Sequence, residues 1–402
     1  MTDAYIFDGI RTPFGRHGGS LSAIRPDDLL GLTLKTLVER NAFKPESYED
    51  VLAGCTNQAG EDSRNVARHA ALFSGLPIEV AGQTVNRLCG SGLAAMMDAA
   101  RAARVGEGEL FLAGGVESMS RAPYVLGKAE TPYARNQPMY DTVIGSRFPN
   151  PWIGREYGNH SMPETADNVA RDLNISREQG DAFAARSQAR YAKALEQGFY
   201  EGEIMGVEVP QGRKQPPLLI DKDEHPRPQS TEDKLAKLGA LFEDGVVTAG
   251  NASGLNDGAA ALIVGTRGAG EKAGVAPRAR IVASAVAGVA PRVMGLGPVP
   301  ASQKALARAG LSLSQMDVIE INEAFAVQVL GCLQGLGLSS DDPRLNMNGG
   351  AIAIGHPLGA SGARLVLTAL RQLEATKGRY ALVTMCIGVG QGIATVIERL
   401  DA

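Results

Sequence analysis

The apolar residues of the chain form short runs and helically spaced stripes, in the order typical of βαβ units. The first hundred or so residues contain three apolar runs with helical patterns between them. The predicted elements are a strand over 4–8, a helix over 27–40, a strand over 51–54, a helix over 64–76, a turn over 85–92, a helix over 93–105 and a strand over 110–113.

The same order of elements returns near the end of the chain. The pattern there predicts a strand over 279–285, helices over 301–309, 326–336 and 361–374, and strands over 318–321 and 380–385. A shift of 270 residues lays Ser91-Gly92 on Ser361-Gly362, and a shift of 267 lays Asp50-Val51 on Asp317-Val318. These matches indicate a duplicated α/β domain, with parallel strands joined by crossover helices.

A stretch of different character separates the two copies. Residues 121–250 are rich in proline, have a helical pattern over 163–197 that is interrupted near Asn174, and include a charged segment over 212–237. Large insertions of this kind usually carry binding function, and the alternative is a lid or a dimer contact without specificity. We therefore divide the chain into a first half (1–120 and 251–275), an inserted loop domain (121–250) and a second half (276–402).

Composition narrows the class of protein. The 402 residues are 44% hydrophobic and 21% charged with a net charge of −4, which is typical of a globular protein and argues against a general nucleic-acid binder. The four cysteines are far apart and form no CxxC, so neither a disulfide framework nor a zinc site is expected. The termini lack targeting signals and no apolar run is of membrane-spanning length, so we expect a soluble cytoplasmic protein without membrane partners.

The segment 346–364, NMNGGAIAIGHPLGASGAR, has five glycines around His356 and leads into a helical pattern. Such glycine density implies unusual backbone angles or a close approach to a ligand. A phosphate-binding loop is the first alternative, but neither a GxGxxG after a clear strand nor a GxxxxGK[ST] is present. Because none of the other four histidines has comparable context, His356 is the histidine that we predict to be catalytic.

Two cysteines and an asparagine stand at similar places. Cys89 in NRLCGSG precedes a predicted helix, whose N-terminal dipole should lower the thiol pKa and favour a nucleophile over an inert buried cysteine. Cys386 follows the strand over 380–385, at the sheet edge where ligands bind. The alternatives are a buried thiol and an active group, and the glycines beside it and the second candidate thiol favour an acid/base partner. Asn322 follows the strand over 318–321 and suits a water or an oxyanion, or alternatively a helix N-cap.

Seven segments together resemble the thiolase family, and the match covers essentially the whole chain. The segments are IRTPFGR (10–16), NRLCGSG (86–92), GGVESMS (114–120), TAGNASGLNDGAAA (248–261), INEAFA (321–326), NMNGGAIAIGHPLGASGAR (346–364) and CIGVGQG (386–392). The resemblance implies a five-layer α-β-α-β-α fold of two similar βαβαβ halves with an inserted loop domain, assembled as a homodimer or homotetramer.

The resemblance also implies a role for each candidate residue. Cys89 is acylated, His356 takes its proton, and Cys386 moves the proton at the α-carbon of acetyl-CoA. Asn322, through a water, and His356 stabilise one oxyanion, and the N–H groups of Cys89 and Gly388 stabilise the other. The residues that match positions around coenzyme A and the acyl pocket are Ser253, Arg227, Met162, Met294 and Phe325. Coenzyme A is a co-substrate, and no metal or tightly bound cofactor is implied.

Three stretches are particularly similar to 3-oxoadipyl-CoA thiolases of aromatic-compound breakdown, namely 57–72, 117–130 and 161–170. The implied reaction converts 3-oxoadipyl-CoA and CoA to succinyl-CoA and acetyl-CoA. The main alternative is an acetoacetyl-CoA or general 3-ketoacyl-CoA thiolase, although Ser161 departs from the histidine of acetoacetyl-CoA enzymes. A decarboxylating ketosynthase would not need Cys386. A non-catalytic CoA-binding protein could lose Cys89, His356 or Cys386, and all three are present. The cations available for a distal carboxylate are Arg121, Lys128, Arg135, Arg147 and Arg155.

Overall fold

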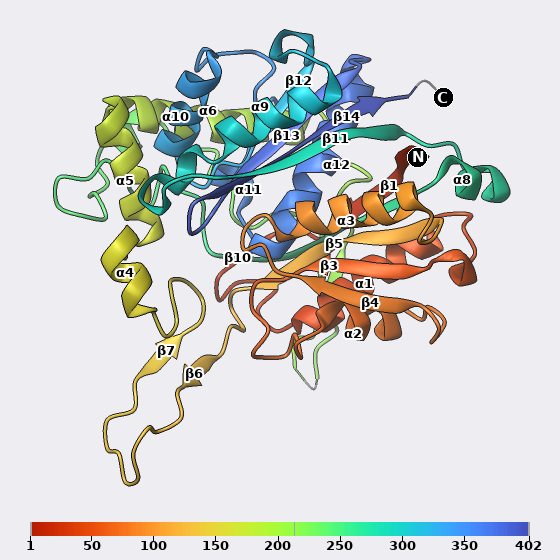
Figure 1. Ribbon diagram of the computed structural model, residues 1–402, viewed down its shortest axis with the longest axis horizontal. Helices are drawn as coiled ribbons and strands as arrows, with labels where there is room; N and C mark the ends of the chain where they lie inside the picture. The colour runs from red at the N-terminus through yellow and green to blue at the C-terminus, as the bar shows by residue number, and fades with distance from the viewer. Residues whose placement is uncertain (1, 213, 401–402) are drawn as a thin grey trace.

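A ten-stranded sheet runs through the computed structural model, which describes residues 2–212 and 214–400 (Figure 1). Nine strands follow the order β12-β13-β14-β11-β1-β10-β5-β3-β4, and β2 pairs with β10 off this path. The strands are β1 (Ala4–Arg11), β2 (Gly15–Arg16), β3 (Asp50–Gly54), β4 (Ala81–Val85), β5 (Leu110–Ser118), β10 (Asn256–Gly265), β11 (Ala279–Gly288), β12 (Val318–Ile321), β13 (Tyr380–Ile387) and β14 (Gln391–Arg399).

The sheet confirms the duplication. Outward from its centre the first half runs β1-β10-β5-β3-β4, and the second half runs β11-β14-β13-β12 in the same order. A single parallel bridge from Ile319 to Leu345 stands where the first half has β4. The two halves join through the antiparallel pair β1–β11, in which Ala4 lies opposite Ile281.

The expectation of parallel strands is wrong for most of the strand pairs in the sheet. The pairs β3–β4, β3–β5 and β12–β13 are parallel, whereas β1, β10, β11 and β14 pair antiparallel with their neighbours. β10 and β14 were not predicted, because their residues are buried almost throughout and therefore show no alternation. β4 was not predicted either, because it is partly exposed and contains a glycine.

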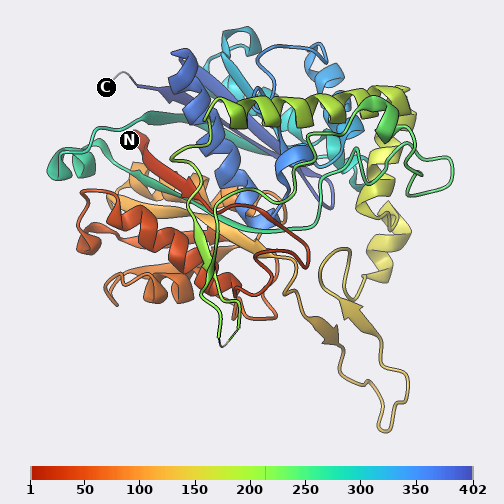
Figure 2. The same ribbon diagram turned by 180° about the vertical axis from the view of Figure 1, so that it is seen from behind.

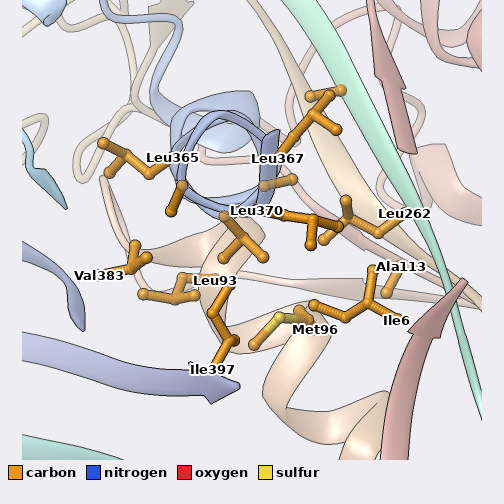
Figure 3. Packing of buried hydrophobic residues seen from close by; sticks show 14 of the residues in the cluster. Ile6, Leu93, Met96, Ala113, Leu262, Leu365, Leu367, Leu370, Val383 and Ile397 are labelled. Atoms are coloured by element: carbon orange, nitrogen blue, oxygen red, sulfur yellow. The ribbon is translucent and has the colours of Figure 1, made fainter. Parts of the chain in front are cut away.

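Two helices form the central layer of the molecule. α3 (Ser91–Val105) and α12 (Leu358–Thr376) pack against each other and against strands of both halves. Figure 3 shows Leu365, Leu367 and Leu370 of α12 beside Leu93 and Met96 of α3, among buried residues of the strands. This apolar cluster contains residues of both halves, so its burial stabilises the packing of one half on the other.

Glycines allow the two central helices to touch through their backbones. A Cβ on Gly92 would lie 2.4 Å from Gly359 O, and a Cβ on Gly362 would lie 2.2 Å from Leu93 N. The glycine density around His356 thus serves backbone-to-backbone packing.

Further helices cover the outer faces, which gives the five layers. On the first half these are α1 (Pro26–Glu39), η1 (Pro45–Ser47), α2 (Val66–Phe73) and α8 (Arg267–Ala273); on the second half they are η2 (Pro291–Leu296), α9 (Pro298–Ala309), η3 (Leu313–Gln315) and α10 (Ala326–Leu336). The short helix α11 (Ala351–Ile354) is buried and packs against α6 (Arg177–Glu196). Within the described ranges, no helix is both long and apolar enough to cross a membrane.

The region between the halves has a projecting hairpin and a helical part. The hairpin of β6 and β7 extends away from the body in both views (Figures 1 and 2). The predicted helical interruption is confirmed, because Asn174 ends α5 in the left-handed conformation with φ 52°. The elements are β6 (Tyr124–Leu126), β7 (Met139–Asp141), α4 (Pro151–Tyr157), α5 (Met162–Leu173), α6 (Arg177–Glu196), β8 (Val207–Val209), β9 (Leu218–Ile220) and α7 (Glu232–Leu235).

A buried arginine fastens this region to the first strand. Arg11, fully buried at the end of β1, pairs with Glu203 at 2.6 Å and with Asp223 at 2.7 Å. Because removing one partner would leave an uncompensated buried charge, this network holds the segment around Asp223 firmly against the body.

Candidate active site

The predicted catalytic residues meet where the parallel strands of both halves end. Cys89 follows β4, Asn322 follows β12, Cys386 lies near the end of β13, and His356 precedes α12. Ligands bind at this carboxyl edge in open α/β sheets.

Cys89 lies on a strained turn at the start of α3. Leu88 has φ 45°, an uncommon conformation for a residue with a side chain. Ser91 holds the turn, because its Oγ accepts from Arg87 N at 2.9 Å and donates to Leu88 O at 2.6 Å. The turn leaves the Cys89 side chain only half-buried.

The pKa of Cys89 moves in the opposite direction to the one expected. Burial raises the pKa of the Cys89 thiol to about 11, and the nearby Glu117 adds to the rise. Contacts with the N–H groups of Gly388 and of Cys89 itself lower this pKa but do not compensate. The direction is opposite to the one expected for a thiol at a helix N-terminus, because burial outweighs the two N–H contacts.

Cys386 is a close neighbour of Cys89. It is almost fully buried in β13, and burial raises its pKa well above the ordinary range, with contributions from Cys89 and then Cys332. All four cysteines are free thiols. The Gly388 N–H, two residues beyond Cys386, faces the Cys89 sulfur together with the N–H of Cys89. The two donors predicted for one oxyanion site thus lie side by side, and their catalytic role stays a prediction.

His356 is buried, and its ring contacts the side chains of Ser361 and Asn322. Ser361 Oγ lies 2.9 Å from Pro357 O and 2.6 Å from His356 Nδ1; when the hydroxyl donates to Pro357 O, Nδ1 carries the ring proton and donates to Oγ. Nε2 is then the basic nitrogen. Burial lowers the pKa of His356 to about 3, and the Arg364 charge contributes to the shift. The imidazole is thus neutral over the ordinary pH range, as a general base requires.

Asn322 completes the histidine's surroundings. Its Nδ2 lies 3.3 Å from His356 Nε2, while none of the described residues donates to its Oδ1. The alternative reading of Asn322 as a helix N-cap is wrong, because Phe325 occupies the N-cap position of α10. No hydrogen bond joins His356 to Cys89 in the described part of the chain; catalytic contacts often tighten only when substrate binds.

The predicted pocket residues gather beside this site. Met294, Phe325 and Cys386 belong to one buried cluster, and Met162 packs against it. A Cβ on Gly388 would lie 3.6 Å from the sulfur of Met162, so the start of α5 adjoins the predicted oxyanion site.

The two predicted coenzyme A contacts differ in placement. Ser253 lies beside the predicted pocket residue Phe325, because its N–H donates to the O atom of the preceding residue, Ala324, at 2.9 Å. Arg227 is exposed, and its Nη1 bonds the backbone oxygens of residues 224–226. His225 connects the two segments, because its ring lies against Gly254. The structure does not bring Arg227 into the catalytic cluster.

Three polar residues at the site were assigned no role in the sequence analysis. The Ser361 hydroxyl contacts His356 Nδ1, Asn256 accepts the His356 N–H, and the buried Glu117 accepts the Gly359 N–H. All three lie inside the segments quoted above, and a polar residue within an otherwise buried stretch is the signal that could have found them. No cluster of metal-ligating side chains occurs among the described residues.

Family models match both halves of the chain. Residues 4–268 match the model described as thiolase, N-terminal domain, and residues 275–399 match the thiolase, C-terminal domain. This chain belongs to the thiolase family. As a thiolase it is an acyltransferase.

Relatives of this thiolase match it over the full length. It is 58% identical to the 3-oxoadipyl-CoA/3-oxo-5,6-dehydrosuberyl-CoA thiolase of Escherichia coli K12, with 100% of both chains covered. It is 56% identical to a beta-ketoadipyl-CoA thiolase of Acinetobacter baylyi, again over 100% of both chains.

A solved structure shows the same fold. Human mitochondrial 3-ketoacyl-CoA thiolase in complex with CoA matches with a TM-score of 0.91 and 39% identity, over 99% of this chain and 98% of that one.

Proposed function

We propose that this thiolase cleaves 3-oxoadipyl-CoA with CoA, giving succinyl-CoA and acetyl-CoA in the catabolism of aromatic compounds. The supporting observation is the pattern of identity: seven curated relatives named for 3-oxoadipyl-CoA or beta-ketoadipyl-CoA are 55–58% identical over nearly the whole chain. A 3-ketoacyl-CoA thiolase of Vibrio vulnificus is 45% identical over 99% of the chain.

The first chemical step forms an acyl enzyme. Cys89 attacks C3 of the substrate while His356 Nε2 takes the thiol proton, and this transfer overcomes the high pKa of the free thiol. Asn322 and His356 stabilise the oxyanion of the departing acetyl-CoA enolate, and the Cys89 and Gly388 N–H groups stabilise the one formed at C3. Cys386 donates the proton that turns the enolate into acetyl-CoA.

The second step releases the product. The thiol of a second CoA gives its proton to Cys386 and attacks the acyl group on Cys89. The bond between the acyl group and Cys89 breaks as the succinyl thioester forms, and the Cys89 sulfur takes back the proton held by His356. Two half-reactions separated by a covalent intermediate predict ping-pong kinetics. Every reacting group in these two steps belongs to the protein, to the 3-oxoadipyl-CoA substrate or to CoA. The proposal therefore includes no metal and no tightly bound cofactor.

The proposal extends to assembly and location. We propose a homodimer or homotetramer, because residues 124–157 expose a set of large apolar side chains that a monomer would leave in water. The set is Tyr124, Leu126, Tyr133, Met139, Ile144, Phe148, Trp152, Ile153 and Tyr157. A cytoplasmic location suits the four free thiols, which a reducing compartment would preserve.

The cations considered for the distal carboxylate differ in their availability. Arg121 is engaged by Glu61, with Nη2 2.6 Å from Oε1, and also bonds Ser22 O. Arg147 bonds Thr142 O at 3.0 Å. The three that remain exposed are Lys128, Arg135 and Arg155. Arg121 is therefore the least available of the five for a substrate.

The test compares thiolysis of 3-oxoadipyl-CoA, 3-oxohexanoyl-CoA and acetoacetyl-CoA by kcat/KM. 3-Oxohexanoyl-CoA has the same six-carbon acyl chain but no distal carboxylate. A preference of about 100-fold for 3-oxoadipyl-CoA, worth about 2.7 kcal/mol of transition-state binding, is expected from a dedicated carboxylate contact. Equal or reversed values would instead favour a general 3-ketoacyl-CoA or acetoacetyl-CoA thiolase, and a Cys89→Ser variant supplies the blank.

A further inference from the structure

The backbone around His356 is held from the opposite half of the chain. His356 lies in the short connection between α11, which ends at Ile354, and α12, which begins at Leu358. Its own N–H donates to Asn256 Oδ1 at 2.8 Å, and the Gly359 N–H donates to Glu117 Oε2 at 3.0 Å. Pro357, between them, has no N–H to contribute. Asn256 and Glu117, two side chains of the first half, therefore hydrogen-bond the backbone at His356 and at Gly359.

Asn256 is itself rigidly placed. It is fully buried at the start of β10, and its Nδ2 donates to Gly15 O at 2.9 Å. Both ends of the amide are therefore satisfied and its orientation is defined. The amide also lies flush against Gly355, where a Cβ would be 2.6 Å from Asn256 Cγ and where φ is 110°. The turn that introduces His356 is thus shaped against this one side chain.

Glu117 joins three segments at the end of β5. Its carboxylate accepts from Thr56 N at 3.0 Å, from Asn57 N at 3.2 Å and from Gly359 N at 3.0 Å. The side chain is almost fully buried, and burial raises the pKa of Glu117 to about 7 against the effect of these N–H groups. A carboxylate at the first turn of α12 also interacts favourably with the helix dipole.

The duplicated position in the second half has no counterpart of Glu117. With the 270-residue shift that relates β5 to β13, the position of Glu117 corresponds to Ile387. The second half therefore has no carboxylate at the equivalent place, and Glu117 reaches across to serve the helix of that half. The first half supplies Cys89 and both contacts that locate His356.

We propose that Asn256 and Glu117 are positioning residues for catalysis, which set the place of His356 relative to Cys89 by holding the backbone of residues 356 and 359. The inference rests on the proposed thiolysis at Cys89. A misplacement of about 1 Å at a catalytic group can cost roughly 100-fold in rate, so loss of either contact is expected to act mainly on kcat.

The experiment measures acylation of Cys89 in a single turnover with 3-oxoadipyl-CoA, together with the steady-state KM for CoA. Asn256→Ala and Glu117→Ala are each expected to slow acylation by about 100-fold and to change the KM by less than about 2-fold. Glu117→Gln keeps one acceptor oxygen for the Gly359 N–H, and Asn256→Asp keeps an acceptor for the His356 N–H but places its second oxygen against Gly15 O, so each should recover part of the rate. These conservative variants also keep the test valid if an alanine variant does not fold.

The decisive comparison uses a His356→Ala background. In the His356→Ala variant the imidazole is absent, so a residue that acts only by positioning it can have no further effect on acylation. Adding Asn256→Ala or Glu117→Ala to this variant should therefore lower its remaining acylation rate by less than about 2-fold. Asn251→Ala is the matched control, because Asn251 is equally buried and bonds Asp181 and Val246 O. Asn251→Ala should lower the melting temperature while acylation stays within about 3-fold of the unmodified enzyme.

Two results would overturn the inference. Full 100-fold losses in the His356→Ala background, or an equal loss from Asn251→Ala, would show that the substitutions damage the fold in general. If the unmodified chain forms no acyl-Cys89, the proposed function fails and the inference fails with it. If the unmodified chain forms acyl-Cys89 normally but the losses from Asn256→Ala or Glu117→Ala add fully to that of His356→Ala, the positioning role is excluded and the proposed function stands.

Discussion

At the scale of single residues, the site keeps its catalytic groups neutral until substrate arrives. Burial raises the pKa of Cys89 to about 11 and lowers that of His356 to about 3, so the resting pair is thiol and imidazole, with no ion pair. A neutral pair avoids placing two charges in a desolvated pocket. In the proposed mechanism, the thiolate forms as the Cys89 proton moves to His356 Nε2 during attack.

This neutral resting state predicts the pH dependence of Cys89 alkylation. Because only the thiolate reacts and its pKa lies near 11, the rate with iodoacetamide should rise about tenfold per pH unit from pH 7 to 9.5 without a plateau. The rate is measured by mass spectrometry of the Cys89 peptide, with Cys89→Ser as the blank for the other thiols. A plateau below pH 9 would mean that the helix dipole, and not desolvation, sets the pKa.

The residues found from sequence differ physically from those that were missed. Cys89, His356 and Cys386 stand beside glycines within short segments, so local context and family resemblance single them out as candidates, and their catalytic roles stay predictions. Asn256 and Glu117 act on partners 100 and 242 residues away. Contacts of that span depend on the fold, and a local pattern does not contain them.

At the scale of elements, helices were predicted better than strands. The helix over 326–336 and the strand over 318–321 have the predicted bounds, because periodicity and sharp ends mark them. β10 is buried along its whole length and β4 carries little apolar signal, so neither shows the alternation of a half-buried strand. The parallel arrangement was inferred without these strands and was therefore only partly correct.

Adding one methyl group at Gly359, in the first turn of α12, is predicted to affect both stability and activity strongly. A Cβ on Gly359 would lie 2.3 Å from Val116 O and 2.5 Å from Gly54 O, both backbone atoms. Gly359→Ala should therefore destabilise the protein by about 3 kcal/mol and displace His356 with the helix. The melting temperature and the acylation rate are measured together.

A second glycine provides the comparison for this substitution. Gly268 lies in α8, and the nearest atom to a Cβ there is 3.9 Å away. Gly268→Ala should leave activity unchanged and raise stability by up to about 1 kcal/mol. Equal stability of the two variants would contradict the packing argument.

At the scale of the whole molecule, the projecting hairpin predicts how copies assemble. Tyr124, Leu126 and Met139 are 62–66% exposed on β6 and β7. If the hairpin buries these side chains against another copy, replacing all three by serine should reduce the mass in solution measured by light scattering. Val105→Ser, a change at a 61% exposed residue on α3, is the control and should leave the mass unchanged. An unchanged mass in the triple variant would exclude the hairpin from the assembly.

The central place of β1 has a consequence for synthesis of the chain. β1 is the first strand to leave the ribosome, yet its sheet neighbours β10 and β11 begin at residues 256 and 279. At roughly 5–20 residues per second, the apolar strand waits about 12 to 50 s for its first partner. During that time β1 has no sheet partner, so slower synthesis of the intervening residues lengthens its exposure and should lower the soluble yield.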